Sequence, residues 1–328
     1  MNTSDFRTEL QIPTSETQIG LDDSVITIGS CFSDVIGSYL INNKFDTLIN
    51  PFGTVYNPVS IFNLLSEQEW DDNKFVASNG SIFHHDAHSS FFGASIAELK
   101  NNLRNVKEKT IDKLNKCNWL IVTVGTAIVY KRKDNGDVVA NCHKVPQKNF
   151  IKGTLSVKEM ISSFEAFYNH IKEINPSINI LLTVSPVRHI KDGLQDNAVS
   201  KSKLRVVCNE LQKQFSNVQY FPSYEVMMDD LRDYRFYKAD MIHPNEVAEN
   251  YIWDKFQETY FDNETQKFIK DWKKVKDAIA HRPFNPKSEA HQKFLAKTLI
   301  ELGAFTDKIE VSQEEAILKE QLIRMQIE

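Results

Sequence analysis

Short apolar runs alternate along the chain with longer segments of helical periodicity. Four runs rich in β-branched residues predict buried strands, at residues 24–29, 119–125, 178–184 and 218–221. Segments with helical periodicity lie at residues 32–41, 158–174, 197–215 and 245–260. Buried strands that alternate with helices are typical of a parallel sheet with helices covering its faces. The pattern therefore predicts an α/β fold.

The pattern changes near residue 262, where the strand-like runs stop. Charged helical segments follow, at residues 264–281, 288–302 and 313–326. We therefore expect an α/β domain over residues 1–261 and a charged α-helical appendage over residues 262–328. The appendage can cover the main domain, form an oligomer or bind a partner, although such charge patterns usually mark solvated helix faces.

Composition narrows the class of protein. The chain has 328 residues, of which 41% are hydrophobic and 11% aromatic, so it can bury a large core, and general disorder is excluded. A net charge of −5 argues against a nucleic-acid partner, which would need a basic excess. No apolar run approaches the length of about 18 residues that a membrane span requires. Residues 1–21 show no secretory signal.

The cysteines are widely spaced and form no CxxC pair: Cys31, Cys117, Cys142 and Cys208. This spacing excludes a zinc ribbon and argues against a disulfide framework. We expect reduced thiols in a cytoplasmic protein.

Polar segments that contain glycine or proline follow three of the predicted strands, at residues 29–34, 123–126 and 183–188. In an open parallel sheet, ligands bind outside the carboxyl ends of the strands. We therefore expect these segments to converge on one edge of the sheet.

The first of these segments carries the candidate nucleophiles. Gly29 allows a tight turn, so Cys31 falls at a helix N-terminus, where the unpaired N–H groups and the helix dipole favour a thiolate and lower the thiol pKa. Ser30 is the alternative nucleophile and would need an adjacent base. The structural alternative makes Cys31 a small buried apolar residue and Ser30 a helix cap.

A base for either nucleophile lies late in the chain. Asp240 precedes His243 by three residues, just before the helical segment 245–260. A carboxylate at this spacing can reach the imidazole Nδ1 and fix its tautomer, which leaves Nε2 for the nucleophile. A purely structural contact between the two side chains is the alternative.

Residues 29–32, Gly-Ser-Cys-Phe, resemble the motif that gives the GSCFA family its name. This family is a branch of the SGNH/GDSL hydrolase superfamily. Further segments resemble the same family, at residues 50–53, 123–126, 141–144, 185–188, 233–237 and 240–244. The resemblance covers residues 29–244, most of the predicted α/β domain. It implies a flavodoxin-like three-layer α/β/α sandwich, with the nucleophile after the first strand and a late Asp-x-x-His completing the triad.

The sequence departs from the superfamily pattern at two positions. Cys31 occupies the place of the usual nucleophilic serine, so Cys31 and Ser30 both stay open as nucleophiles, with Cys31 favoured. The oxyanion hole of the superfamily uses a backbone N–H that Gly53 would supply here. It also uses an Asn side chain, but Gly125 and Thr126 stand at that place, where the Thr126 hydroxyl can substitute.

Other polar side chains suggest substrate contacts. The run from His84 to His88 can ligate a metal, line a substrate pocket or serve the structure; we expect no metal and assign His88 to substrate binding. Arg188 follows a strand end and can hold an anionic group, or form a surface salt bridge. Residues 141–144 are expected to be a pocket wall.

Together these features predict an ester-bond hydrolase that forms a covalent acyl-enzyme on a small-molecule or glycan acyl ester. Cys31 or Ser30 attacks, and His243, oriented by Asp240, moves the proton, so no cofactor is required. Acyl transfer at the same site is one alternative. A binding or scaffolding protein is the other, because the nucleophile is altered and the oxyanion Asn is missing.

Overall fold

The computed structural model describes residues 8–66 and 69–323. At its centre is a five-stranded sheet in the order β10-β9-β5-β1-β2, in which every adjacent pair is parallel. The strands are β1 (Ser24–Gly29), β2 (Asp46–Ile49), β5 (Trp119–Val124), β9 (Asn179–Val184) and β10 (Val218–Phe221). This order has the flavodoxin-like topology, in which successive connections run in opposite directions from the first strand.

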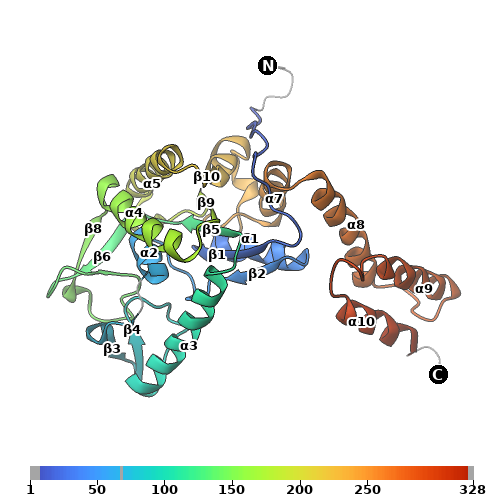
Figure 1. The fold of residues 1–328 in the computed structure, drawn as a ribbon, viewed down its shortest axis with the longest axis horizontal. Coiled ribbons are helices and arrows are strands. Elements are labelled where there is room, and N and C mark those ends of the chain that lie inside the picture. The colour runs from blue at the N-terminus through green and yellow to red at the C-terminus, as the bar shows by residue number, and fades with distance from the viewer. Residues whose placement is uncertain (1–7, 67–68, 324–328) are drawn as a thin grey trace.

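Helices cover both faces of this sheet, and side chains along each strand point alternately to the two faces. On one face, Ile26 and Leu120 pack against helices that include α2, α4 and α5. On the other face, Val25 and Ile121 pack against α1 and α7. These helices are α1 (Cys31–Asn42), α2 (Pro58–Ser66), α4 (Val157–Ile174), α5 (Leu194–Gln214) and α7 (Glu246–Tyr260). The predicted three-layer α/β/α sandwich is thereby confirmed (Figure 1).

Two small antiparallel sheets and a long helix extend the main domain. One sheet pairs β3 (Phe75–Ser78) with β4 (Ser81–His84), and the other has the strand order β7 (Val138–Val139), β6 (Ile128–Arg132) and β8 (Phe150–Thr154). The long helix is α3 (Ile96–Leu114). The short helical segments are η2 (Asp72–Lys74), η3 (Gln147–Asn149), η4 (Ile190–Asp192), α6 (Ser223–Glu225), η5 (Val226–Asp230) and η6 (Tyr234–Phe236). The backbone N–H groups of Ala140 and Asn141 donate to the His85 carbonyl at 3.0 and 2.9 Å, which joins β4 to the segment after β7.

The C-terminal helices form a lobe beside the sandwich (Figure 1). They are α8 (Asn263–Ala280), α9 (Glu289–Gly303) and α10 (Ser312–Ile323). Trp272 of α8 is fully buried, and its Nε1 donates to the Asn42 carbonyl at 3.0 Å. Lys44 lies with its Nζ 2.7 Å from Glu314 of α10. The lobe therefore packs against the C-terminal end of α1 and the turn that follows it.

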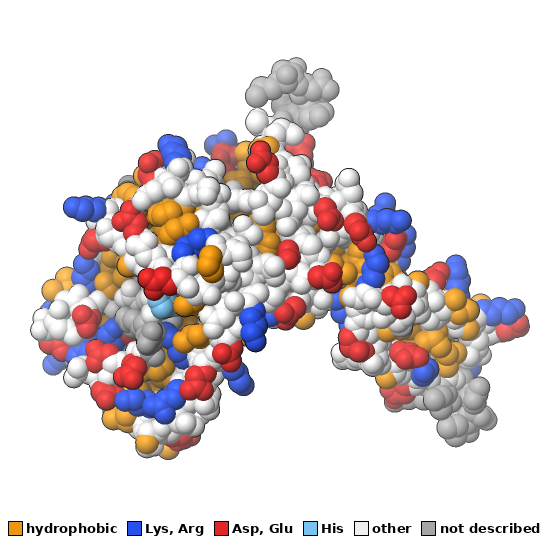
Figure 2. All heavy atoms as spheres, in the orientation of Figure 1, with side chains coloured by type: hydrophobic (Ala, Val, Ile, Leu, Met, Phe, Trp, Pro, Cys, Tyr) orange, Lys and Arg blue, Asp and Glu red, His pale blue; other side chains and the backbone are white. Residues whose placement is uncertain are grey.

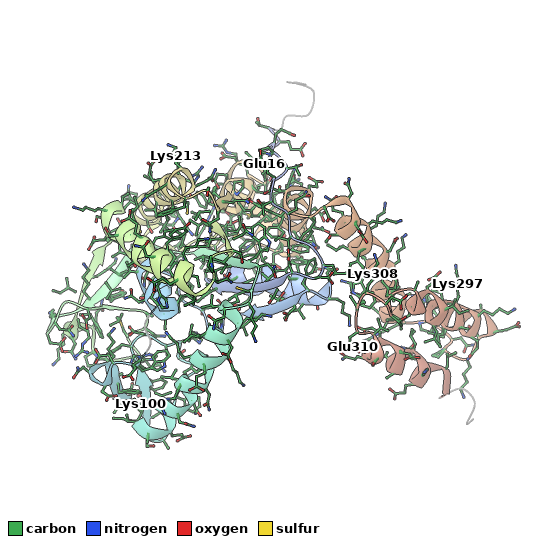
Figure 3. The ribbon with its side chains drawn as sticks, viewed as in Figure 1. Glu16, Lys100, Lys213, Lys297, Lys308 and Glu310 are labelled. Carbon is green, nitrogen blue, oxygen red and sulfur yellow. The ribbon has the colours of Figure 1, made fainter. Side chains whose placement is uncertain are left out.

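The surface carries both signs of charge. Figure 2 shows basic and acidic side chains interspersed over the sandwich and the C-terminal lobe. Lys213, Lys100 and Lys297 mark α5, α3 and α9 and extend outward into solvent (Figure 3). Within residues 8–66 and 69–323, no helix is both long and apolar enough to cross a membrane.

The helices predicted from periodicity all form, and within the described residues their ends differ from the predicted ones by no more than three residues. The predictions missed β2, α2, α3 and both small sheets, because these segments are short, half-buried or strongly charged and carry little apolar periodicity. Two predictions fall partly outside the described residues. One is that residues 1–21 contain no secretory signal, of which residues 1–7 are not described, and the other is the end of the helix expected at residues 313–326.

Candidate active site

The carboxyl ends of three adjacent strands bring the predicted segments together. Gly29 of β1 pairs with Thr123 of β5, and Val124 pairs with Val184 of β9. The Ser30 N–H donates to the Thr123 carbonyl at 3.0 Å. Gly29 has a φ of +133°, and a Cβ there would lie 2.1 Å from the same carbonyl oxygen, so only glycine fits this crossing.

Ser30 is the N-cap of α1. Its Oγ accepts the Phe32 N–H at 3.3 Å, and the residue is fully buried. An N-cap hydroxyl satisfies one of the unpaired N–H groups in the first turn of a helix. The Ser30 hydroxyl therefore has a structural partner and no exposed surface.

Cys31 is the first residue of α1 and is half-buried. The pKa of its thiol is raised above the ordinary value, chiefly by burial and then by the negative charge of Asp34. Its own backbone N–H, Lys201 and Lys238 act in the opposite direction. The expected lowering of this pKa is thus wrong: loss of solvent and a carboxylate one turn along the helix outweigh the helix terminus. At neutral pH Cys31 is therefore mainly in the thiol form.

Asp240 and His243 form the predicted pair. Asp240 Oδ2 lies 2.7 Å from His243 Nδ1, while Oδ1 accepts the backbone N–H groups of Ile242 and His243 at 2.8 and 3.0 Å. These three hydrogen bonds lower the pKa of Asp240 to about 2, with the backbone donors contributing most. The carboxylate is therefore charged across the neutral range, and His243 Nδ1 carries the hydrogen, which leaves Nε2 as the proton acceptor.

The loop that carries His243 lies at the same edge of the sheet. The Arg188 N–H, just past the end of β9, donates to the Ile242 carbonyl at 3.2 Å, and the Lys238 N–H donates to the His243 carbonyl at 2.7 Å. Charges in this loop act on the strand ends: Lys238 on the Cys31 thiol, and His243 on the His189 imidazole. The Asp240–His243 loop and Cys31 thus belong to one cluster of charged groups.

Gly53 has a different role from the one expected. Its N–H donates to the Asn50 carbonyl at 2.8 Å and closes a turn, so this N–H is not available to an oxyanion. Instead, the absence of a side chain at Gly53 makes room for His88, because a Cβ on Gly53 would lie 2.4 Å from the Cβ of His88. His88 Nδ1 contacts Ser90 twice, at 3.2 Å from the backbone N–H and at 2.9 Å from Oγ. In the tautomer in which Nδ1 accepts the N–H, the hydrogen of a neutral ring is on Nε2. His88 also acts electrostatically on Asp34.

The segment at the end of β5 is tightly bonded. The N–H groups of Gly125 and Thr126 both donate to the Tyr56 carbonyl, at 2.7 and 3.1 Å. The Thr126 hydroxyl accepts the Ile128 N–H at 3.0 Å and lies 3.0 Å from Ser200 Oγ. These hydrogen bonds hold the end of β5 in place. The Thr126 hydroxyl has structural partners and does not serve as the oxyanion donor that the sequence suggested.

Arg188 stacks on aromatic rings, and it forms no salt bridge with any residue that the structure describes. Its guanidinium carbon lies 4.3 Å from the centre of the Tyr237 ring and 5.2 Å from that of Tyr234. With Arg232 and Met228 these residues line a pocket of about 240 Å³ beside the His243 loop. The pocket can hold an apolar or anionic portion of a ligand.

The remaining histidines of the predicted polar run serve the small sheets. His84 ends β4 and is buried, whereas His88 lies in a loop, so the two do not share a helix face. His143 Nε2 lies 2.8 Å from the His84 carbonyl, and His85 Nδ1 lies 2.8 Å from the Asn141 carbonyl. Among the residues that the structure describes, no group of three or more acidic, histidine or cysteine side chains is arranged to hold a metal ion.

Two titratable side chains at the site were not predicted from the sequence. Lys201 of α5 is 1% exposed, and its Nζ donates to the Ser185 carbonyl at 2.6 Å. His189 lies against Gly125, with its Nε2 buried and without a hydrogen-bond partner in the described part of the chain. Burial lowers the pKa of Lys201 to about 7 and that of His189 to about 4. Lys201 looks like any lysine in a helical pattern, so no sequence signal marks it.

Comparison with known proteins gives a family. One solved structure with some likeness is an acetyl xylan esterase from the rumen bacterium Butyrivibrio proteoclasticus, at 11% identity and a TM-score of 0.30, covering 76% of this chain and 66% of that one. No curated protein matches. The sequence model of the GSCFA family matches residues 24–256, and that of the GSCFA domain protein C-terminal domain matches residues 272–324. The chain therefore belongs to the GSCFA family.

Proposed function

We propose that the protein is an ester-bond hydrolase in which Cys31 is the nucleophile, His243 the general base and Asp240 the residue that orients the base. The observation that carries this proposal is the 2.7 Å contact between Asp240 Oδ2 and His243 Nδ1, in a loop held to the sheet edge where α1 begins. Ser30 is the weaker nucleophile candidate, because its hydroxyl is buried and caps α1.

The first half-reaction forms a thioester. His243 Nε2 takes the proton from the Cys31 thiol while Sγ attacks the carbonyl carbon of the ester, giving a tetrahedral intermediate. As the C–O bond to the leaving alcohol breaks, the proton passes from His243 to that oxygen. The raised thiol pKa makes this base necessary, because little thiolate exists at neutral pH before substrate binds.

The second half-reaction restores the enzyme. A water molecule attacks the thioester carbonyl while His243 takes one of its protons. The C–S bond then breaks, the carboxylic acid leaves, and the proton returns from His243 to Cys31. Asp240 keeps its charge throughout and stabilises the imidazolium at both steps.

We assign the oxyanion to two donors. One is the backbone N–H of Cys31, in the first turn of α1. The other is His88 Nε2–H, in the tautomer in which Nδ1 accepts the Ser90 N–H. This assignment replaces the Gly53 N–H and the Thr126 hydroxyl, which have structural partners.

The test is a set of alanine variants assayed on p-nitrophenyl acetate and butyrate. Cys31→Ala and His243→Ala should each lower kcat/KM by about 10³-fold or more, while Ser30→Ala stays within about tenfold of wild type. Cys142→Ala is the matched control, because this thiol is also half-buried but lies outside the proposed triad. Intact-mass analysis after acid quench should find one acetyl group on wild type and none on Cys31→Ala. Wild-type rates in both Cys31→Ala and His243→Ala would refute the proposal.

A further inference from the structure

The environment of Lys201 is unusual for a lysine. The residue is 1% exposed, and its Nζ has one carbonyl acceptor, that of Ser185, and lies 5.7 Å from the centre of the Tyr224 ring. In the described part of the chain no carboxylate contacts it. An ammonium group buried without a carboxylate is costly, and an apolar side chain of the same length would fill this space at lower cost. Packing therefore does not account for a lysine here.

Lys201 and Cys31 lie at the same edge of the sheet. The Lys201 ammonium binds the Ser185 carbonyl just past β9, and the Ser185 N–H donates to the Val124 carbonyl of β5 at 2.9 Å. The carbonyl of the preceding residue of β5, Thr123, accepts the Ser30 N–H at 3.0 Å, directly before Cys31.

Cys31 is the ionisable group that acts on Lys201. The thiolate of Cys31 favours the charged form of Lys201, and the ammonium of Lys201 favours the thiolate, so each offsets the burial of the other. The Cys31 sulfur also senses the carboxylate of Asp34 from α1 and the exposed ammonium of Lys238 from the His243 loop. The Lys201 charge acts further on His189, which also senses Asp192 and His243.

We propose that Lys201 is a positioning residue for Cys31, its buried ammonium group acting as the electrostatic partner of the sulfur once the thiol has lost its proton. The inference rests on the proposed function for the role of Cys31 as nucleophile. Lys201 forms no bond and transfers no group in the reaction; the proton of Cys31 goes to His243, and Lys201 keeps its own. It thereby stabilises the negative sulfur twice: when Cys31 loses its proton to attack the ester, and when the C–S bond of the thioester breaks.

The test measures the charge at Cys31 without an ester. Iodoacetamide alkylates thiolates, so its rate at Cys31, followed by peptide mass spectrometry from pH 6 to pH 9.5, reports the thiolate fraction. Lys201→Met removes the charge and keeps the chain length. We expect about tenfold slower alkylation of Cys31 at pH 7 in this variant, a size typical of the interaction between two charges inside a protein.

The pH profile separates an electrostatic role from a structural one. Lys201 is charged below about pH 7, so the ratio of wild-type to variant rates should be largest near pH 6 and decline as the pH rises. Lys201→Arg, which keeps the charge, should restore most of the wild-type rate. Cys142 is the internal reference, because its thiol senses Lys191 and not Lys201.

Lys203→Met is the matched control on the same helix, since Lys203 Nζ binds the Leu155 carbonyl at 3.2 Å and does not act on Cys31. Thermal unfolding verifies each variant, and Lys201→Gln replaces the Met variant if that one does not fold. Equal alkylation of Cys31 in wild type and the neutral variant, or a ratio that is constant with pH, overturns the inference. A normal Lys201 effect combined with full esterase activity in Cys31→Ala refutes the hydrolase proposal instead.

Discussion

The ring of His88 fills the space that a side chain at Gly53 would need. A Cβ on Gly53 would lie 2.4 Å from His88 Cβ and 2.7 Å from His88 Cγ, and Gly53 has a φ of +72°. Gly53→Ala should therefore lose about 1–2 kcal/mol of unfolding free energy from backbone strain and also displace His88. We expect kcat/KM for p-nitrophenyl acetate to fall at least about tenfold, the size of a partly lost oxyanion donor.

Gly80 offers the matched control for this variant. It has a φ of +78°, and a Cβ there would meet no atom within 4 Å. Gly80→Ala should show the backbone strain in urea denaturation without any loss of activity. Equal activity in the Gly53 and Gly80 variants would contradict the role given to His88.

Ser30 should contribute to stability rather than to chemistry. Removing its cap in Ser30→Ala is expected to lower the unfolding free energy by about 0.5–2 kcal/mol, and Ser30→Gly by only a few tenths. Ser95 caps α3 by accepting the Glu98 N–H at 3.2 Å, far from the site in sequence, so Ser95→Ala is the control. The urea midpoints should fall in both alanine variants; a loss of activity greater than 100-fold in Ser30→Ala would instead make Ser30 the nucleophile.

Asp240→Asn should lower kcat more than it changes KM. The amide cannot stabilise the His243 imidazolium and can favour the wrong tautomer, so kcat should fall between about 10²- and 10⁴-fold. Asp262 supplies a control outside the site, because its carboxylate caps α8 by accepting the Thr265 N–H at 2.7 Å. Asp262→Asn should keep the wild-type kcat, and an unchanged kcat in Asp240→Asn would remove the dyad from the mechanism.

The charge of Asp240 also has a consequence for pH. Its folded pKa is about 2, below the ordinary 3.8, so its contribution to stability is present above about pH 4 and is lost as the pH falls through 2. Loss of activity between pH 4 and 6 therefore cannot come from protonation of this carboxylate.

The buried histidines should make the protein sensitive to acid. Burial lowers the pKa of His84 and His85, and that of His143 to about 4, so the unfolded chain binds more protons than the folded one between about pH 4 and 6.5. Stability should therefore fall as the pH drops through this window. His143→Gln should reduce the loss between pH 7 and pH 4.5 by about 1 kcal/mol or more.

Urea denaturation at the two pH values measures this difference. His170 of α4 is the control, because it lies outside the cluster of His84, His85 and His143. His170→Gln should show the wild-type pH dependence. An equal loss in the His143 variant and wild type would mean that other groups cause the acid sensitivity.

Trp272 should anchor the C-terminal lobe. It is fully buried, and its Nε1 binds the Asn42 carbonyl at 3.0 Å. Trp272→Ala should cost about 3–5 kcal/mol and expose the lobe to limited proteolysis, whereas Trp272→Phe should lose about 1 kcal/mol with the hydrogen bond. The candidate active site lies at the other end of α1, roughly 18 Å away for a helix of this length. Hydrolysis of short esters at low temperature should therefore persist in the variant if the proposed function holds. An unchanged melting temperature in Trp272→Ala would contradict this anchoring.

The order of apolar runs and helices was enough to predict a parallel sheet covered by helices, because a strand buried on both faces leaves a continuous apolar signal. The three-layer arrangement came from the resemblance to the GSCFA family. The sequence also indicated one edge for residues 29–34, 123–126 and 183–188, since parallel strands share the direction of their carboxyl ends. The Asp240–His243 contact follows from local spacing alone. Edge strands such as β2 and the charged helix α3 were missed, because half-buried elements leave too few apolar positions to detect.

Only the tertiary structure decided how individual groups at that edge are used. Sequence proximity to a helix terminus suggested an acidic thiol at Cys31, but burial and Asp34 reverse the shift. Gly53 kept its importance and changed its role, because its N–H is taken by a turn and its missing side chain admits His88. Lys201 carried no signal at all, because whether a lysine is buried at the carboxyl ends of the strands depends on which segments pack together. Packing between distant segments is not encoded in local periodicity.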